Sequence, residues 1–284
     1  MDNITLIEKV ERFRRLHHSD KMLILPNIWD TLGALLMADL GYPAVATASA
    51  SVAYSNGYND GENIPFNDVL TLLKRITGSI DLPVTADIES GYASDDSQVE
   101  QNIKLLIDAG IVGINIEDTD KKTNTLRSID FQSNRIKLIR KAAEESGIPL
   151  FINARTDVYL HEKDFANDMA KLNELITRGL AYKEAGADGF FPILVKQQDE
   201  IKEIIDRVKL PINIITMPGI PDLKTLDKLG VARISVGPSL LKIAVKAMKD
   251  LATQLKDHEG LSSITGNEIT SDFLKSLVSK KRPL

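Results

Sequence analysis

The sequence predicts an α/β protein built as a (β/α)8 TIM barrel. Eight short apolar runs, rich in valine and isoleucine, alternate with longer amphipathic stretches along the 284 residues, and this alternation is typical of parallel strands joined by helices. Each run is apolar on both faces, as a buried parallel strand requires. An open doubly wound sheet is the rival architecture. The count of eight runs and the lack of a glycine-rich nucleotide loop after the first run weigh against it.

The expected elements follow one another in a regular order. Strands are expected at residues 22–25, 44–49, 83–92, 113–118, 149–155, 189–194, 211–216 and 233–236. The helices that follow them are expected at residues 30–40, 67–78, 94–109, 133–146, 164–185, 197–208, 221–229 and 239–255. Glycine follows several of these helices, as at Gly41 and Gly110, and it is a common residue after the last helical turn. An extra helix at residues 6–18 precedes the barrel.

The chain is predicted to form one domain over residues 1–284, because no proline- or glycine-rich linker marks a boundary. The barrel takes about residues 22–258, and the tail of residues 259–284 contains a further helix at 271–279. The tail is too short to be a domain. We therefore expect it to pack on its own barrel or on a neighbouring subunit.

The composition excludes several classes of function. Cysteine is absent, which excludes disulfides, thiolate metal sites and cysteine nucleophiles. The net charge of −5 and the lack of a basic block argue against a nucleic-acid partner. The start of the chain is not a signal peptide and no apolar run reaches membrane-spanning length, so a cytoplasmic protein without a membrane partner is expected. His17 and His18, at the end of the first helix, are expected at the surface.

Two acids, Asp87 and Glu89, end the third expected strand. Alternation along a strand would put both carboxylates on one face. Two adjacent anions repel each other and are costly to bury unless a cation lies between them, and a divalent ion such as Mg²⁺ would serve. The alternative is a strand that ends here, with both acids facing water.

Further acids follow the neighbouring strands. Asp60 comes after the second strand and Glu117 ends the fourth. Active sites of this fold lie at the C-terminal ends of the strands, so these two acids could converge with Asp87 and Glu89 on one point. The pattern shows no local lysine partner for the four carboxylates, which favours a metal site. Oxygen ligands without cysteine favour Mg²⁺ or Mn²⁺ over zinc.

Candidate substrate contacts lie on the same side of the barrel. Arg155 ends the fifth strand, and its guanidinium suits a substrate carboxylate, although an ion pair with one of the acids fits the spacing equally well. Thr47, Ala48 and Ser49 end the second strand. Their small side chains let backbone N–H groups approach an oxyanion, or they simply allow close packing. Asn213, on the seventh strand, is a weaker candidate.

Six segments together resemble the isocitrate lyase/phosphoenolpyruvate mutase superfamily, in order along nearly the whole barrel. They are PNIWD (26–30), TASASVAYSNGYNDGE (47–62), ADIESGY (86–92), GINIED (113–118), INARTD (152–157) and SVGPSL (235–240). The resemblance implies that Asp87 holds Mg²⁺ directly, while Glu89, Glu117 and Asp60 reach it through water.

The resemblance also has implications for the substrate and the assembly. It implies that Arg155 and the backbone of Ala48 and Ser49 hold a 2-oxo acid or its enolate. Superfamily members cleave or form C–C or P–C bonds beside such a group. They are usually tetramers whose last helix is swapped between subunits, so a homo-oligomer is implied here, either a tetramer or a dimer.

The segment after the fourth strand departs from one branch of the superfamily. Isocitrate and methylisocitrate lyases carry Lys-Lys-Cys-Gly-His there, whereas this chain has TDKKTNTLR at residues 119–127. Residues 122–126 instead resemble the Lys-Thr-Asn-Ser-Leu gate of the phosphonopyruvate branch. Lys122 and Asn124 are therefore candidate catalytic residues on a lid, and a solvated basic loop is the alternative. The histidine or glutamate that those branches carry after strand six is replaced by about Ile193.

The sequence thus predicts a Mg²⁺-dependent lyase or hydrolase. It would cleave a C–C bond beside a 2-oxo or 2-hydroxy carboxylate through a pyruvate-like enolate, with an oxaloacetate- or methylisocitrate-like small-molecule substrate. Asp60 would help to position a water or a proton transfer. Phosphonopyruvate or phosphoenolpyruvate P–C chemistry is the second enzymatic interpretation. A non-catalytic keto-acid-binding protein is the third, because the lid lacks the cysteine and histidine of the lyases.

Overall fold

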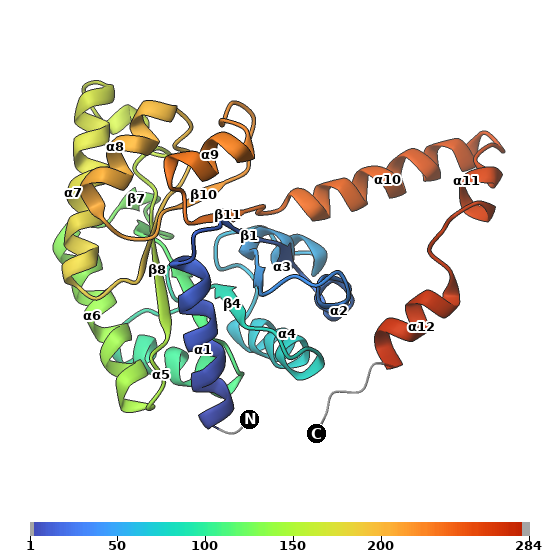
Figure 1. The fold of residues 1–284 in the computed structure, drawn as a ribbon, viewed down its shortest axis with the longest axis horizontal. Coiled ribbons are helices and arrows are strands. Elements are labelled where there is room, and N and C mark those ends of the chain that lie inside the picture. Colours follow the sequence, from blue (N-terminus) through green and yellow to red (C-terminus); the bar gives the residue numbers. More distant parts are fainter. Residues whose placement is uncertain (1–2, 280–284) are drawn as a thin grey trace.

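The computed structural model describes residues 3–279 and arranges eight parallel strand positions as one closed barrel (Figure 1). Every position overlaps one of the expected runs, so the predicted (β/α)8 barrel is confirmed. The strands are β1 (Leu23–Leu25) with its continuation β2 (Asn27–Ile28), β3 (Val45–Thr47), β4 (Val84–Asp87), β5 (Gly113–Ile116), β8 (Phe151–Thr156), β9 (Gly189–Pro192), β10 (Asn213–Ile215) and β11 (Arg233–Ser235).

Pro26 divides the first strand position into two short pieces, because proline has no N–H to contribute to a ladder. β1 pairs in parallel with β11, whereas β2 pairs in parallel with β3. The ring continues through β4, β5, β8 and β9. A bridge between Phe190 and Ile212 links β9 to the start of β10, and β10 pairs with β11 to close the barrel.

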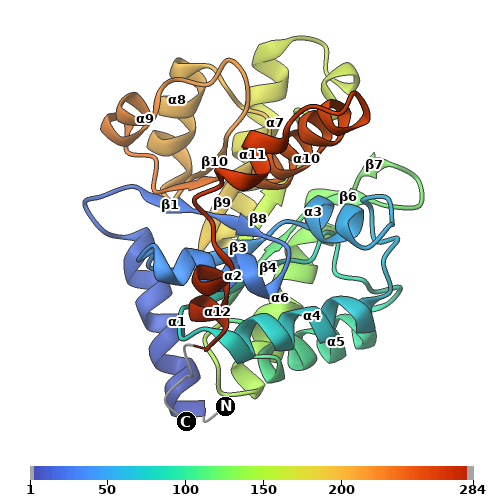
Figure 2. The ribbon, with the colours of Figure 1, turned by 90° about the vertical axis from the view of Figure 1, so that its right-hand side faces the viewer.

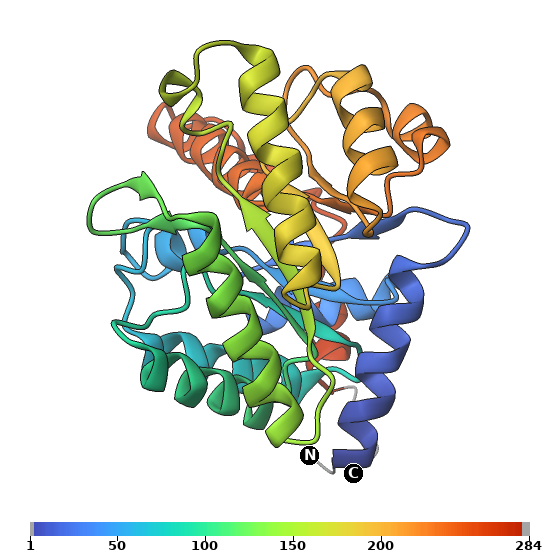
Figure 3. The same cartoon turned by 90° about the vertical axis from the view of Figure 1, so that its left-hand side faces the viewer.

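Helices cover the outside of the barrel, and α5 to α8 pack each against the next, as the side view in Figure 3 shows for α6 (green) and α7 (yellow). The helices that surround the strands are α1 (Asn3–His17), α2 (Thr31–Asp39), α3 (Ser49–Ser55), α4 (Phe66–Ser79), α5 (Asp96–Asp108), α6 (Ile129–Glu145), α7 (Asp168–Glu184), α8 (Gln198–Val208) and α9 (Leu223–Leu229). The last strand is followed by α10 (Ser239–Lys256).

Local capping explains where the observed helices differ from the expected ones. α6 begins at Ile129 instead of residue 133, because the Ser128 side chain accepts a hydrogen bond from the Phe131 N–H. α7 begins at Asp168 instead of residue 164, because Asn167 caps it in the same way and a separate 3₁₀ turn, η1 (Glu162–Asp164), precedes it. The short helix α3 was not expected, and it begins directly after β3.

The first helix packs against the barrel through an apolar stripe that ends in a histidine. Phe13 lies so close to Gly113 that a Cβ there would come within 3.1 Å of its ring. His17 stacks on Phe151 with ring centroids 4.2 Å apart, and its Nδ1–H donates to the Phe13 carbonyl. His17 is 4% exposed, so the expectation of a surface position was wrong for His17 and correct for His18, which is exposed.

The buried His17 predicts a pH-dependent stability. Burial, together with the positive charge of Arg233, lowers the pKa of His17 from 6.5 to about 3. Between these values the unfolded chain binds a proton that the folded chain does not, so stability is lost as the pH falls below 6.5. At pH 5 this loss is about 2 kcal/mol relative to pH 7. Urea titrations at both pH values should show it, and His17→Leu should remove it while His18→Leu retains it. An equal loss in the His17→Leu variant contradicts the assignment.

The C-terminal part of the chain leaves the barrel. α10 extends away from it, α11 (Leu261–Thr265) lies at the far end, and α12 (Ser271–Ser279) returns to pack against α2 (Figures 1 and 2). Large apolar side chains are exposed along α10, among them Ile243 at 65% and Met248 at 63%. The last predicted tail residues, 280–284, lie outside the described part of the chain. Nowhere in residues 3–279 does a helix have the length and apolar character needed to cross a bilayer.

Candidate active site

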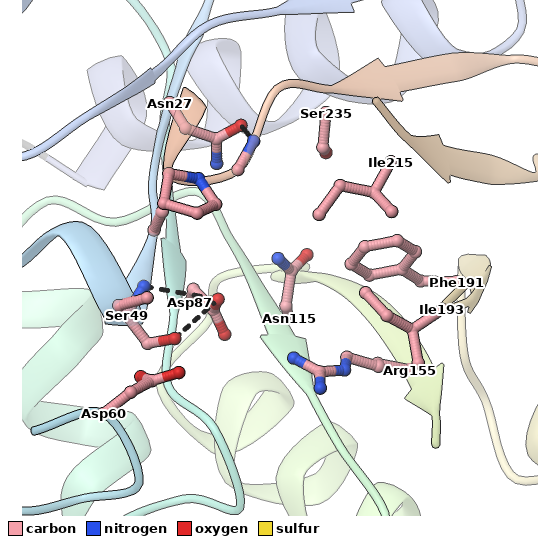
Figure 4. Close-up of a pocket in the computed structure, with 14 residues that line it drawn as sticks. Asn27, Ser49, Asp60, Asp87, Asn115, Arg155, Phe191, Ile193, Ile215 and Ser235 are labelled. Atoms are coloured by element: carbon pink, nitrogen blue, oxygen red, sulfur yellow. Dashed lines mark hydrogen bonds between the residues drawn. The ribbon is translucent and has the colours of Figure 1, made fainter. Parts of the chain in front are cut away.

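A cavity of about 180 Å³ opens at the C-terminal ends of the barrel strands (Figure 4). A wider cavity of about 620 Å³ lies outside it and shares Asp60 and Arg155 with it. Most of the substrate and metal candidates predicted on these strands therefore lie close together. The residues that line the inner cavity are Asn27, Ala48, Ser49, Ala50, Asp60, Asp87, Asn115, Arg155, Phe191, Ile193, Ile215, Ser235, Gly237 and Pro238.

Asp87 ends β4 and is oriented by the end of β3 and the start of α3. Its Oδ2 accepts hydrogen bonds from the Ser49 hydroxyl at 3.1 Å and from the Ser49 N–H at 3.4 Å. Its own N–H donates to the Thr47 hydroxyl at 3.1 Å. Thr47 thus supports Asp87 and does not line the inner cavity. Asp60 faces the same cavity, and its partial loss of hydration together with the charge of Asp87 raises the pKa of Asp60.

Glu89 lies beyond the end of β4, in the left-handed conformation with φ of 51°. Strand alternation therefore does not place it on the face of Asp87, contrary to the expectation. Its side chain is 1% exposed, and Oε1 accepts hydrogen bonds from the Glu62 N–H and the Tyr92 hydroxyl. Burial raises the pKa of Glu89, and Lys121 opposes this effect.

Lys121 corrects one expectation about the acids. Its ammonium lies 3.1 Å from Glu89 Oε2 and also pairs with Glu117 Oε1. The prediction that these carboxylates have no local lysine partner was therefore wrong. Lys121 follows Glu117 by four positions in a loop, and the sequence pattern did not show that this loop folds back over the site.

Arg155 is the penultimate residue of β8 and lines both cavities. Its Nη1 lies 2.8 Å from Glu117 Oε2, and its Nε donates to Asp157 Oδ1 at 2.6 Å. The ion-pair interpretation of Arg155 is thus correct for the described residues, and the guanidinium is held at the cavity by two acids. Asp157 also accepts a hydrogen bond from Thr119, whose hydroxyl lies 3.3 Å from His161 Nε2.

Beneath the inner cavity the barrel interior is polar. Arg233 is fully buried, and its Nε donates to the Ser235 hydroxyl while Nη2 lies 3.4 Å from Asn115 Oδ1. Burial lowers the pKa of Arg233 to about 9, and the negative charge of Asp87 opposes this effect. Asn213 accepts a hydrogen bond from the Ser235 hydroxyl in this layer. Its side chain does not line the inner cavity, so the structure does not bring Asn213 to the place where a contact with substrate was expected.

The segment predicted as a lid is a β-hairpin at the mouth of the barrel (Figure 2). β6 (Thr119–Asp120) pairs antiparallel with β7 (Thr125–Leu126). The Asp120 carboxylate accepts from the N–H groups of Lys122 and Thr123 and shapes the turn. Lys122 and Asn124 are both exposed; Asn124 lines the outer cavity, whereas Lys122 lines neither cavity.

The donor atoms around Asp87 suit a hard divalent cation. Asp60 and Asp87 face one cavity, and Glu89 and Glu117 present buried oxygens close to the Lys121 ammonium. Carboxylate oxygens of this kind are the ligands that Mg²⁺ prefers. Within residues 3–279, no three such side chains are close enough together to hold one ion. Direct coordination of one cation by three or more of these acids therefore requires their side chains to move closer together.

Several residues that shape the site were not predicted from the sequence. Asn27 accepts from the N–H groups of Val236 and Gly237, so it ties β2 to the end of β11. Its position in the PNIWD segment was the only available signal. Glu62 accepts from the N–H groups of Ser90 and Tyr92 and fixes the turn after β4. A contact of this kind, between loops distant in sequence, has no local pattern.

Comparison with known proteins agrees with this geometry. The model of the phosphoenolpyruvate phosphomutase family matches residues 13–256. A crystal structure of a Burkholderia cenocepacia protein, named as a candidate phosphonomutase, is 40% identical with a TM-score of 0.82, covering 87% of this chain and all of that one. The 2-methylisocitrate lyase of Bacillus subtilis is 26% identical, covering 88% of this chain and 83% of that one.

A further solved structure is that of phosphonopyruvate hydrolase in complex with oxalate and Mg²⁺. It has a TM-score of 0.83 at 20% identity, covering 95% of this chain and 94% of that one. At this identity the likeness shows the fold alone. The match of the family model over most of the barrel, however, decides the relationship. The chain belongs to the phosphoenolpyruvate phosphomutase family, within the isocitrate lyase/phosphoenolpyruvate mutase superfamily of lyases and mutases.

Proposed function

We propose that this protein is a Mg²⁺-dependent carbon–carbon lyase that acts on a small 2-hydroxy or 2-oxo carboxylate through a pyruvate-like enolate. The observation that carries the proposal is the meeting of Asp60, Asp87 and Arg155 at one small cavity. Acids there supply oxygen ligands for a hard cation, and the guanidinium supplies a fork that matches a carboxylate. The lyase named among the relatives, and the Mg²⁺ and oxalate named for phosphonopyruvate hydrolase, support the same chemistry.

Each group has a defined part in this proposal. Asp87, with Asp60, Glu89 and Glu117, would hold Mg²⁺, which stabilises negative charge on an enolate oxygen. Arg155 binds and orients the carboxylate of the substrate, and its two ion pairs hold it in place before binding. Asp60, which faces the cavity, positions a water or carries a proton. The hairpin with Lys122 and Asn124 excludes water when it lies over the mouth.

Phosphorus–carbon bond chemistry on phosphonopyruvate is the second candidate. The observation in its favour is the 40% identity to the Burkholderia cenocepacia protein named as a candidate phosphonomutase, together with the KTNTL segment. A phosphonate is a dianion and needs positive partners. Arg155 is the one cationic side chain among the described residues that line the inner cavity, and we therefore rank this chemistry second.

An assay panel tests the proposal. The purified protein should be incubated with Mg²⁺ and with 2-hydroxy and 2-oxo acids in turn, and pyruvate or other 2-oxo products measured. We expect turnover of at least one hydroxy or oxo acid, and loss of this turnover with EDTA. Turnover of phosphonopyruvate alone would favour the second candidate. Tight binding of 2-oxo acids without any turnover would favour a non-catalytic keto-acid-binding protein.

We also propose that the protein is a homo-oligomer, a tetramer or a dimer, that buries α10. The exposed apolar side chains of this helix support the proposal, because several large apolar side chains on one extended helix are costly to leave in water. They are Ile243, Val245, Met248 and Leu255. Light scattering should give a mass above that of one chain, and Ile243→Asp with Met248→Asp should reduce it. A monomeric mass of the unmodified protein contradicts the proposal.

A further inference from the structure

The inner cavity has two chemically different sides. Ser49, Asp60 and Asp87 lie on one side, and Phe191, Ile193 and Ile215 lie opposite them, as Figure 4 shows. Phe191 and Ile193 come from β9 and the residue after it, and Ile215 comes from the end of β10. Phe191 is 3% exposed and Ile193 is 6% exposed, so both belong to a packed wall.

The apolar side offers no charged partner to a ligand. Of the described residues that line the inner cavity, Arg155 is the one with a positive charge, and Glu117 and Asp157 already pair with it. The Lys121 ammonium is held by Glu89 and Glu117. An anionic group placed against Phe191, Ile193 and Ile215 would lose hydration without gaining a hydrogen bond from these three side chains, which is unfavourable.

We infer that the substrate of this protein carries an alkyl substituent, and not a second acidic group, on the side of the reacting carbon opposite the metal-binding acids. This inference rests on the proposed function, because Arg155 and the cation must first fix the 2-oxo or 2-hydroxy carboxylate end. The other end of the ligand then lies against the apolar wall. The substrate class is a short 2-oxo monocarboxylate that carries a hydroxyl group and a linear or branched alkyl group on C4. Cleavage of its C3–C4 bond leaves the electron pair on C3 as the enolate, while the C4 hydroxyl loses its proton and C4 leaves as the carbonyl carbon of an aldehyde or ketone.

A matched pair of ligands tests the inference on the unmodified protein. 4-Methyl-2-oxopentanoate has two methyl groups where oxaloacetate has the two oxygens of its distal carboxylate, so the two ligands have nearly the same shape. Isothermal titration with Mg²⁺ should show that the methyl compound binds about ten-fold tighter or more. Equal or tighter binding of oxaloacetate, or its faster turnover, overturns the inference.

Oxalate separates this inference from the proposed function. It has the two adjacent oxygen-bearing carbons of the enolate end and no distal group, so it does not reach the apolar wall. Mg²⁺-dependent binding of oxalate with no preference within the matched pair overturns the inference and leaves the proposed function standing. Absence of Mg²⁺-dependent oxalate binding overturns the proposed function, and with it the inference.

Substitution of Ile193 provides a second readout. Ile193→Lys places a positive charge on the apolar wall and should reverse the preference in favour of oxaloacetate, whereas Ile193→Leu should keep the preference for the methyl compound. Thermal denaturation should first establish that both variants fold. A folded Ile193→Lys variant with an unchanged preference overturns the inference. The comparison on the unmodified protein decides the question if that variant does not fold.

Discussion

Replacement of Arg155 by methionine is expected to lower kcat/KM by about a hundred- to a thousand-fold, the effect of removing one aligned charge-stabilising group. The guanidinium lines both cavities and is held between Glu117 and Asp157. It is therefore oriented before the substrate arrives, and it suits a carboxylate by shape as well as by charge. Steady-state kinetics with Mg²⁺, on the acid that the assay panel identifies, measures the effect.

Arg155→Lys is the matched control for this prediction. Methionine leaves Asp157 without its ion-pair partner and Glu117 with Lys121 alone, and breaking a buried pair in this way costs about 3 kcal/mol or more of stability. Lysine keeps a positive charge near both acids and loses the planar fork. We expect a folded Arg155→Lys protein with an intermediate loss of kcat/KM. Native kcat/KM in a folded Arg155→Met protein would show that Arg155 is only a structural ion pair.

Replacement of Asp87 by asparagine is expected to abolish Mg²⁺ binding and to lower activity by about a thousand-fold or more. Asparagine keeps the size of the side chain and an oxygen that accepts from Ser49, so the local fold should survive. It loses the negative charge that a hard cation requires. Mg²⁺ titration in the presence of oxalate and steady-state kinetics measure the two effects.

Asp199→Asn is the matched control for Asp87→Asn. It removes one carboxylate from the exposed first turn of α8, and Asp199 lines neither cavity. This variant should bind Mg²⁺ as the native protein does. If Asp87→Asn also binds Mg²⁺ with native affinity, the metal site lies elsewhere and the assignment of Asp87 is wrong.

The barrel was predictable from the sequence because its signals are local. Buried strands of a parallel sheet are short apolar runs, and each of the eight strand positions overlaps such a run. The position of Asp87 at the end of a strand followed from the same pattern. Helix starts were less predictable. Ser128 and Asn167 cap α6 and α7, but other residues of the capping type lie nearby in the sequence, so the pattern alone does not show which one begins the helix.

The electrostatics of the site were not predictable in the same way. Lys121 reaches Glu89 and Glu117 because residues 119–126 form a hairpin that folds over the barrel mouth, and no periodicity describes that fold. Arg233 lies in a run that reads as an ordinary buried strand, yet its charge is buried in the barrel interior. In the sequence, the only sign of the apolar wall was that neither histidine nor glutamate stands near Ile193.

The central claim is that Asp87 and its neighbouring acids bind Mg²⁺ beside Arg155 and that a small oxyacid binds there with the metal. Isothermal titration of the purified protein with oxalate, with and without Mg²⁺, tests this claim most directly. We predict saturable binding of one oxalate per chain with Mg²⁺ and weak or no binding without it. Oxalate binding of equal strength in the presence and absence of Mg²⁺, or none in either case, would contradict the claim.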